Sequence, residues 1–346
     1  MVNIEHVKSL VESGIGMGSF SGGYEEYEGA VLEGAFSEDM CTSISEELDE
    51  CVVDLHEFTA GASAMIIESA LDPMADNQRL EVLSEASLAG VKQRVVNFFE
   101  KLAKFFKTLA VKIASYFLAF FNMSKKWLKL NKERINKITS SDAKRKMQPW
   151  SMGMLKKLDN SNFKTEGFDQ LKGIYGEAGK GAGYAGEKDS IEKEVLKNFA
   201  SDLESVGKMK EWLRKSIGMA EKPSEIKVIE HKADFLAVIE GAADLGKSLS
   251  KAAKSAADKA KAESKAWSSA AKDFKKDSKK DDDANADLAK TAKLTMQCWN
   301  VAQKAFTKYA SLVQQITKQA SKDCMGALNS LISATGVWKE KKDKKD

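Results

Sequence analysis

Prolines, cysteines and long apolar runs are scarce in this chain of 346 residues. Its three prolines and its 43% of hydrophobic residues exclude collagen-like and low-complexity chains. The four cysteines (Cys41, Cys51, Cys298 and Cys324) lie far apart, in no spacing typical of a metal or redox site, which indicates a reducing compartment. No apolar run reaches the roughly 18 residues of a membrane span, so we do not expect an orthodox one.

Motifs of catalysis are missing as well. The three histidines, His6, His56 and His231, lie in no pattern with another ligand or base. No GxSxG, HExxH or paired-cysteine zinc pattern occurs. Gly241–Ser248 (GAADLGKS) has the spacing of a Walker A motif, but it lies inside the helical segment 228–274 and not between a strand and a helix. Gly179-Lys180-Gly181 lacks both the upstream glycine and the following Ser or Thr of a phosphate loop. The sequence therefore predicts a protein that is not an enzyme and has no catalytic residue, cofactor or metal site.

Charge is divided unevenly along the chain, although the formal net charge is only +3. Residues 1–85 contain 19 acids and two bases, a net charge of −17, which leaves +20 for the remaining residues. Such asymmetry indicates parts with different partners or different fates. An acidic tail that is merely solvated and disordered is the alternative interpretation.

The acidic part predicts little structure of its own. A short helix is plausible over residues 43–55, because Ile44, Leu48, Val52 and Leu55 recur at helical spacing. Nothing in residues 1–85 resembles a self-sufficient core, so we expect a weakly structured acidic segment.

A basic, aromatic-rich helix is expected over residues 86–140. Apolar residues recur there at steps of three and four, the period of one helical face. Representative members of that face are Phe98, Phe105, Leu109, Ile113, Phe120 and Trp127. Flanking lysines permit an interfacial membrane helix. A packing helix in a protein core is the favoured interpretation, because most such stripes are core.

The rest of the chain predicts a connector followed by long helices. Residues 141–189 are polar and rich in glycine, which is typical of a flexible linker. Helical periodicity then covers residues 190–217, 228–274 and 288–331. The last two segments have heptad spacing and a charged turn between them, which predicts an antiparallel hairpin. No segment shows convincing strand alternation, so the expected fold class is all-α.

These patterns divide the chain into five parts. They are an acidic N-terminal pro-segment or targeting segment (1–85), a basic amphipathic helix (86–140), a Gly-rich polar linker (141–189), a helical bundle with a long hairpin (190–336) and a basic tail (337–346).

The boundary between the acidic and basic parts carries a short pattern, Leu83-Ser84-Glu85-Ala86. A glutamate with leucine or isoleucine two positions before it occurs also at Glu12, Glu46, Glu50 and Glu68. With Glu57, which follows Leu55 and His56, six of the 14 glutamates up to Glu85 fit this pattern, and none of the 15 later ones does. It resembles the recognition sequence of the prohead proteases of large tailed bacteriophages.

Over about the first 140 residues, the chain is therefore similar to the internal head proteins of such phages. The resemblance implies a non-enzymatic virion protein, made in the host cytoplasm, cleaved by a prohead protease and packaged inside the head. Implied partners are other virion proteins of the capsid or core and, by non-specific electrostatics, the genomic DNA. We also expect a homo-oligomer.

Removal of residues 1–85 would raise the net charge from +3 to +20 and favour binding to a polyanion. The expected nucleic-acid contacts are Lys247, Lys251, Lys254, Lys259, Lys261 and Lys265. These lysines alternatively only solvate a long helix. Two other functions stay open: a membrane-active protein that acts through residues 91–130, and an assembly, shell or tail component that keeps its N-terminal segment.

Overall fold

The computed structural model describes residues 43, 45–55, 57, 77–159, 163–178, 188–276 and 282–335. These residues are mainly helical, which confirms the expected all-α class with a long helix and an extended hairpin. A helix of residues 45–55 precedes the labelled elements. Those elements are α4 (Asn77–Lys137), β1 (Lys144–Met147), η1 (Pro149–Ser151), α5 (Met154–Asp159), η2 (Thr165–Asp169), α6 (Leu171–Ala178), α7 (Lys188–Lys197), η3 (Val206–Lys208), α8 (Met209–Ser216), β2 (Ser224–Lys227), η4 (Val228–His231), α9 (Lys232–Lys276) and α10 (Asp282–Ala334).

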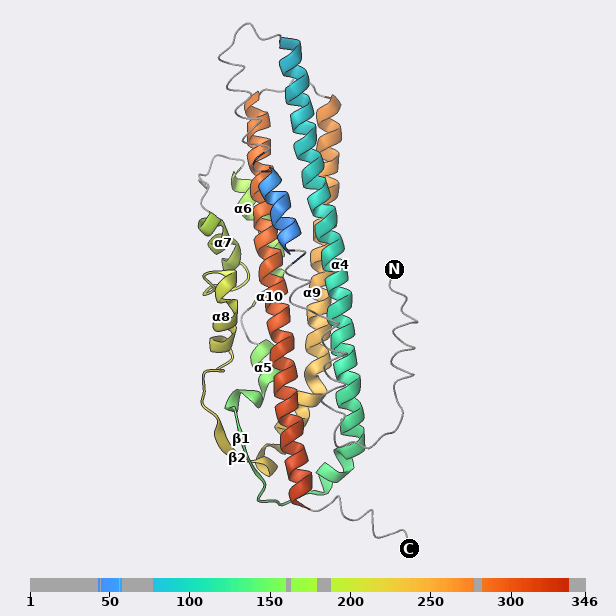
Figure 1. Cartoon of the computed structure of the whole chain (residues 1–346), viewed down its shortest axis with the longest axis vertical. Helices are drawn as coiled ribbons and strands as arrows, with labels where there is room; N and C mark the ends of the chain where they lie inside the picture. The colour runs from blue at the N-terminus through green and yellow to red at the C-terminus, as the bar shows by residue number, and fades with distance from the viewer. Residues whose placement is uncertain are drawn as a thin grey trace.

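Three long helices, α4, α9 and α10, form the frame (Figure 1). α9 runs antiparallel to both of the others. Lys92, in the N-terminal third of α4, donates to the carbonyl of Ala270 near the end of α9. Lys232, at the start of α9, donates to the carbonyl of Ile138 just after α4. Figure 1 shows α9 and α10 running in opposite directions, which confirms the predicted hairpin. The predicted basic helix begins nine residues earlier than expected, at Asn77 instead of residue 86.

Small residues of α9 let α4 approach closely. A Cβ atom added at Gly246 would lie 2.3 Å from the Cβ and Cγ atoms of Phe117 on α4. One turn further, the Ser250 hydroxyl donates to the Ala110 carbonyl at 3.1 Å, and Ala253 is fully buried. Side chains of this size allow two helix backbones to pack at short distance. The small-residue stripe of α9 therefore holds α4 in place.

Aromatic rings fill the interior between the long helices and a layer of short ones. Phe99 packs edge-on against Trp299, with ring centroids 5.7 Å apart, and Phe106 packs against Phe168 at 5.4 Å. Phe163 and Tyr309 stack at 4.0 Å. Edge-on and stacked pairs add to the free energy gained from buried area. This cluster joins α4 and α10 to the segment around η2.

The predicted Gly-rich linker is wrong for most of its length. Trp150, Met154, Leu158, Phe168 and Leu171 are buried, and the short helices α5 and α6 pack on α9 and α10. Gly167 serves packing, because a Cβ there would lie 2.8 Å from the ring of Phe199. Helices of six and eight residues are too short to show a periodic pattern, so the sequence did not predict this layer of short helices. Residues 179–187 of the linker lie outside the described part.

Two further expectations are corrected. The segment 190–217 is two helices, α7 and α8, because the chain leaves the helix after Lys197 and turns Phe199 and Leu203 into the core. A two-stranded antiparallel sheet also exists, in which β1 pairs with β2 from Lys144↔Lys227 to Met147↔Ser224. Four residues per strand are too few for visible alternation. The sheet ties the end of α4 to the start of α9.

Candidate functional site: a docked acidic helix on a basic body

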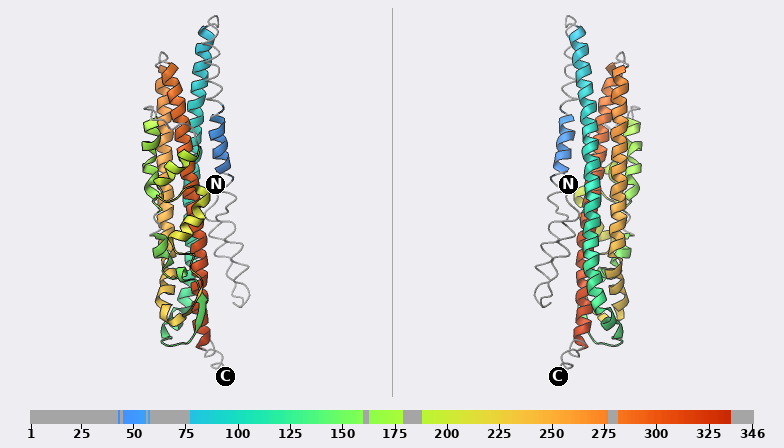
Figure 2. Two further views of the ribbon diagram at one scale, coloured as in Figure 1. Left: turned by 90° about the vertical axis from the view of Figure 1, so that its left-hand side faces the viewer. Right: turned by 90° about the vertical axis from the view of Figure 1, so that its right-hand side faces the viewer.

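The helix of residues 45–55, here called the acidic helix, has five acids and no base. It lies against the upper half of α4 and α10 in Figure 1, and Figure 2 shows it on the outside of the long helices. Leu48 and Leu55, seven residues apart, are fully buried, and Cys51 and Val52 pack partly against the same core. The short helix predicted over residues 43–55 is therefore present, and its apolar face is docked.

Polar contacts fasten the acidic helix to both long helices. The Asp49 carboxylate accepts hydrogen bonds from the Asn300 amide and the Lys304 ammonium on α10. Glu47 forms a 2.9 Å ion pair with Lys101 on α4. The Arg94 guanidinium, two turns before Lys101 on α4, donates to the backbone carbonyl of Asp54 at 3.0 Å. The acidic part of the chain is thus paired directly with bases of the basic part.

Two titratable groups respond to this docking. The hydrogen bond that Lys101 donates to the Glu47 carboxylate, and then the charge interaction with Cys51, raise the pKa of Lys101 above its ordinary value. Burial raises the pKa of the Cys51 thiol, and the positive charge of Lys101 opposes that rise. Both shifts favour a neutral Cys51 thiol on the acidic helix and a charged Lys101 on α4.

The predicted processing residues fall at two places. Leu83, Ser84, Glu85 and Ala86 lie in the first turns of α4, which project beyond the ends of α9 and α10 (Figure 1). Glu46 and Glu50 are exposed on the acidic helix. Glu12 and Glu68 lie outside the described residues. A protease acts on locally opened chain, so cleavage at Glu85 requires the first turns of α4 to unwind.

The predicted nucleic-acid contacts line one face of α9. Lys247, Lys251, Lys254, Lys261 and Lys265 are exposed and, at 3.6 residues per turn, fall within about 40° of one line along the helix. Lys259 lies off this face and forms a 2.6 Å ion pair with Asp169. The face spans about 27 Å at 1.5 Å per residue. Five of the six lysines are thus placed together, and the sixth is a structural ion pair.

Acids interrupt this lysine face. Asp244 pairs with Lys247 at 3.0 Å, and Asp258 lies among Lys251 and Lys254 in a shallow hollow of about 500 Å³. Glu263 points inward instead, where the Tyr175 hydroxyl donates to its carboxylate at 2.8 Å and Lys172 lies 3.4 Å away. Burial, and then the charge of Glu263, raise the pKa of Tyr175. No local sequence pattern predicted this Tyr–Glu–Lys group.

The predicted membrane or packing face of α4 is a packing face. Phe98, Phe105, Leu109, Ile113 and Phe120 are buried in the bundle, and Trp127 is half-buried. By length and composition alone, Gly90–Lys137 is long and apolar enough to cross a membrane, and it is the one such helix in the described part of the chain. The core helix of a soluble bundle meets the same criterion, and 44% of its most apolar stretch is buried here.

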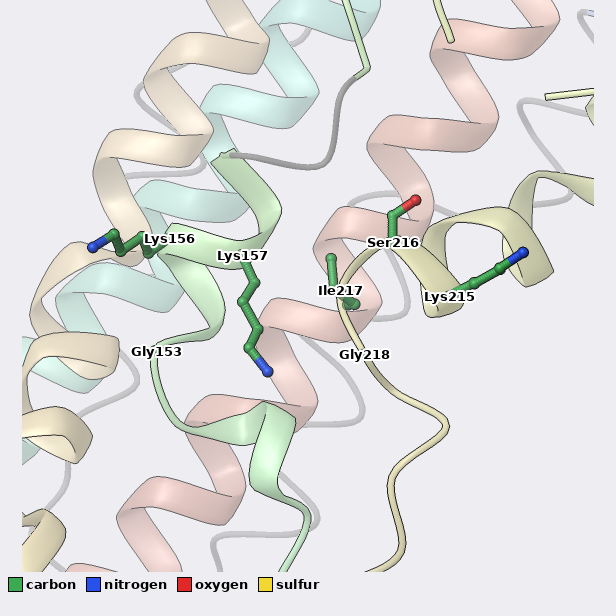
Figure 3. Close-up of a pocket in the computed structure, with 7 residues that line it drawn as sticks. All are labelled: Gly153, Lys156, Lys157, Lys215, Ser216, Ile217 and Gly218. Carbon is green, nitrogen blue, oxygen red and sulfur yellow. The ribbon is translucent and has the colours of Figure 1, made fainter. Parts of the chain in front are cut away.

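A second hollow, of about 620 Å³, lies between α5 and the end of α8 (Figure 3). Three lysines line it, but Lys156 and Lys215 point away from each other, and only Lys157 extends toward the loop at Gly218. An anion site requires converging donors. Within the described residues, no group of three or more His, Cys, Asp or Glu side chains is placed to hold a metal ion.

Comparison of the chain with protein-family models, curated proteins and solved structures finds no match.

Proposed function

We propose that this chain is a non-enzymatic structural protein of a bacteriophage virion, an internal head protein that is cleaved after Glu85 and packaged with the genome. The supporting observation is the acidic helix, whose carboxylates at Glu47 and Asp49 pair with Lys101 and Lys304 of the basic body. Before cleavage, the acidic segment reduces attraction between the body and nucleic acid.

After cleavage, the product would carry a net charge of +20. Its α9 face would offer Lys247, Lys251, Lys254, Lys261 and Lys265 to phosphates, without reading base sequence. Capsid or core proteins and a prohead protease are the other proposed partners. This reading needs no catalytic residue and no cofactor.

The mature N-terminus tests the proposal. Mass spectrometry of the protein taken from purified particles is expected to find Ala86 as the first residue and no peptide from residues 45–55. Recovery of residues 45–55 at the same abundance as α9 and α10 would contradict maturation at Glu85.

A second candidate is a shell, tail or assembly component that keeps its N-terminal segment. One observation favours it: Leu48 and Leu55 complete the core between α4 and α10 instead of lying loosely on it. Full retention of residues 45–55 in particles, together with oligomers that persist in high salt, is the result expected of this candidate.

A further inference from the structure

The outer face of α4 combines exposed apolar side chains with lysines. Val111 and Leu118 are 57% and 58% exposed, although α4 is a core helix. Ala114 and Ser115 are exposed beside them. In the right-hand view of Figure 2, α4 lies in front of the other long helices.

Lysines extend this face at both ends. Lys104 and Lys107 are exposed above Val111, and Lys125, Lys126 and Lys129 are exposed below Leu118. At 3.6 residues per turn, all five fall within about 60° of the line through Val111, and Lys104 and Lys129 are about 37 Å apart. We call this set, with Val111, Ala114, Ser115 and Leu118, the outer stripe of α4.

Acids are excluded from this part of α4. From Lys101 to Lys132 inclusive, the helix carries eight lysines and no aspartate or glutamate. Lys101 and Lys132 at the two ends are paired, with Glu47 and Glu240 respectively. Glu100 and Glu133 mark the limits of the stripe. The uninterrupted positive charge and the exposed apolar centre match a partner that is both anionic and apolar.

We infer that the outer stripe of α4 is a docking surface for an anionic lipid bilayer, on which α4 lies flat. Val111 and Leu118 enter the boundary of the acyl chains, and lysine stems lie along it with their ammonium groups at phosphates. The buried face of α4 stays in the bundle, so the helix does not cross the membrane. This inference is independent of the proposed virion role.

Other partners fit less well. A second copy docked through the same stripe would place lysines against lysines in either orientation, which is repulsive. Duplex DNA would leave Val111 and Leu118 against a charged backbone without an apolar partner. Only a lipid surface supplies phosphates and hydrocarbon side by side along about 37 Å.

The test is vesicle flotation with the full-length chain. Vesicles of phosphatidylcholine with 30 mol% (about one lipid in three) phosphatidylglycerol are expected to carry the protein, and pure phosphatidylcholine vesicles much less. Val111→Ser with Leu118→Ser is expected to weaken binding at least tenfold. The matched control is Val53→Ser with Leu130→Ser, because these side chains are 53% and 60% exposed but lie off the stripe.

Charge is tested separately. Replacement of Lys104, Lys107, Lys125 or Lys129 by Gln is expected to weaken binding about fivefold per lysine near the anionic surface. Lys210→Gln, at an exposed lysine of α8, makes an equal charge change elsewhere and is expected to leave flotation unchanged.

Three results would overturn the inference. The first is that the chain does not float with anionic vesicles at low salt. The second is that the stripe pair and the control pair lose vesicle binding equally. The third is that V111S/L118S changes the sedimentation of the chain without changing its flotation. The last would assign the stripe to contact between copies of the chain. Circular dichroism and thermal unfolding of each variant confirm that the fold is kept.

Discussion

At the scale of single residues, the contact between α9 and α4 depends on the missing side chain of Gly246. In most helices, Gly→Ala stabilises by about 1 kcal/mol. Here the added Cβ would overlap Phe117 at its Cβ and Cγ, which cannot rotate away. We expect Gly246→Ala to lower the free energy of unfolding by about 1–2 kcal/mol net, because overpacking exceeds the helix gain.

Gly173→Ala is the matched control. Gly173 lies in α6, and nothing lies within 4 Å of the position of an added Cβ. This change is expected to stabilise by about 0.5–1 kcal/mol. Urea unfolding of the two variants measures both signs, and a stabilised Gly246→Ala protein would disprove the close approach of α4.

Asp323 on α10 gives the chain a pH dependence of known sign. Burial raises the pKa of its carboxyl, against hydrogen bonds from Gln319 and Ser151 and the charge of Arg145. The folded state then binds the proton more tightly than the unfolded state, so stability falls as pH rises above the ordinary Asp pKa of about 3.9. Asp323→Asn is expected to be more stable than the parent at pH 7.

The same substitution is expected to show no advantage at pH 3, where both chains are neutral at this position. Urea unfolding of parent and variant at several pH values from about 3 to 7 measures the difference. A difference independent of pH would show that packing, and not charge, separates the two proteins.

At the scale of elements, the acidic helix is held by carboxylates that can be removed in pairs. Glu47 and Asp49 face Lys101, Asn300 and Lys304, whereas Glu46 and Glu50 are exposed on the same helix. Glu47→Gln with Asp49→Asn is expected to increase hydrogen exchange of residues 45–55 about tenfold, since the lost interactions total about 1–2 kcal/mol.

Glu46→Gln with Glu50→Gln makes the same change of charge and is expected to leave exchange unaltered. Equal exchange in the two variants would mean that Leu48 and Leu55 hold the helix alone. Mass spectrometry of peptides from this segment gives the readout.

Elements differ in how far the sequence predicted them. The spacing of Leu48 and Leu55 predicted the acidic helix, and heptads predicted α9 and α10, because both periods are local. The partners of the acidic helix on α10, Asn300 and Lys304, lie about 250 positions after Asp49, and no local pattern joins them to it. The layer around Trp150 and Phe168 was missed because its helices are too short and its glycines serve close packing.

At the scale of the whole molecule, the uneven charge predicts how the chain responds to nucleic acid. A chain that begins at Ala86 is expected to bind random-sequence duplex DNA more tightly than the full chain, with a steeper dependence on salt. Fluorescence anisotropy between about 50 and 200 mM salt measures both. Lys251→Ala with Lys254→Ala is expected to reduce the salt slope by about 2, since each phosphate contact contributes about 0.9.

Lys210→Ala with Lys215→Ala on α8 provides the control, because both lysines are exposed away from the α9 face. Equal reductions in slope would show that DNA is attracted to the net charge alone and not to α9.

The acidic helix and α4 belong to one polypeptide, and this continuity sets how the two can separate. While they are joined, the acidic helix is held near α4 and α10 at a local concentration in the millimolar range, and a soluble competitor has to approach that level to displace it. Hydrolysis of one peptide bond at Glu85 would abolish this advantage. Two leucines and a few ion pairs would then hold a free peptide only loosely at the dilution of a cell, so scission by itself would suffice for departure.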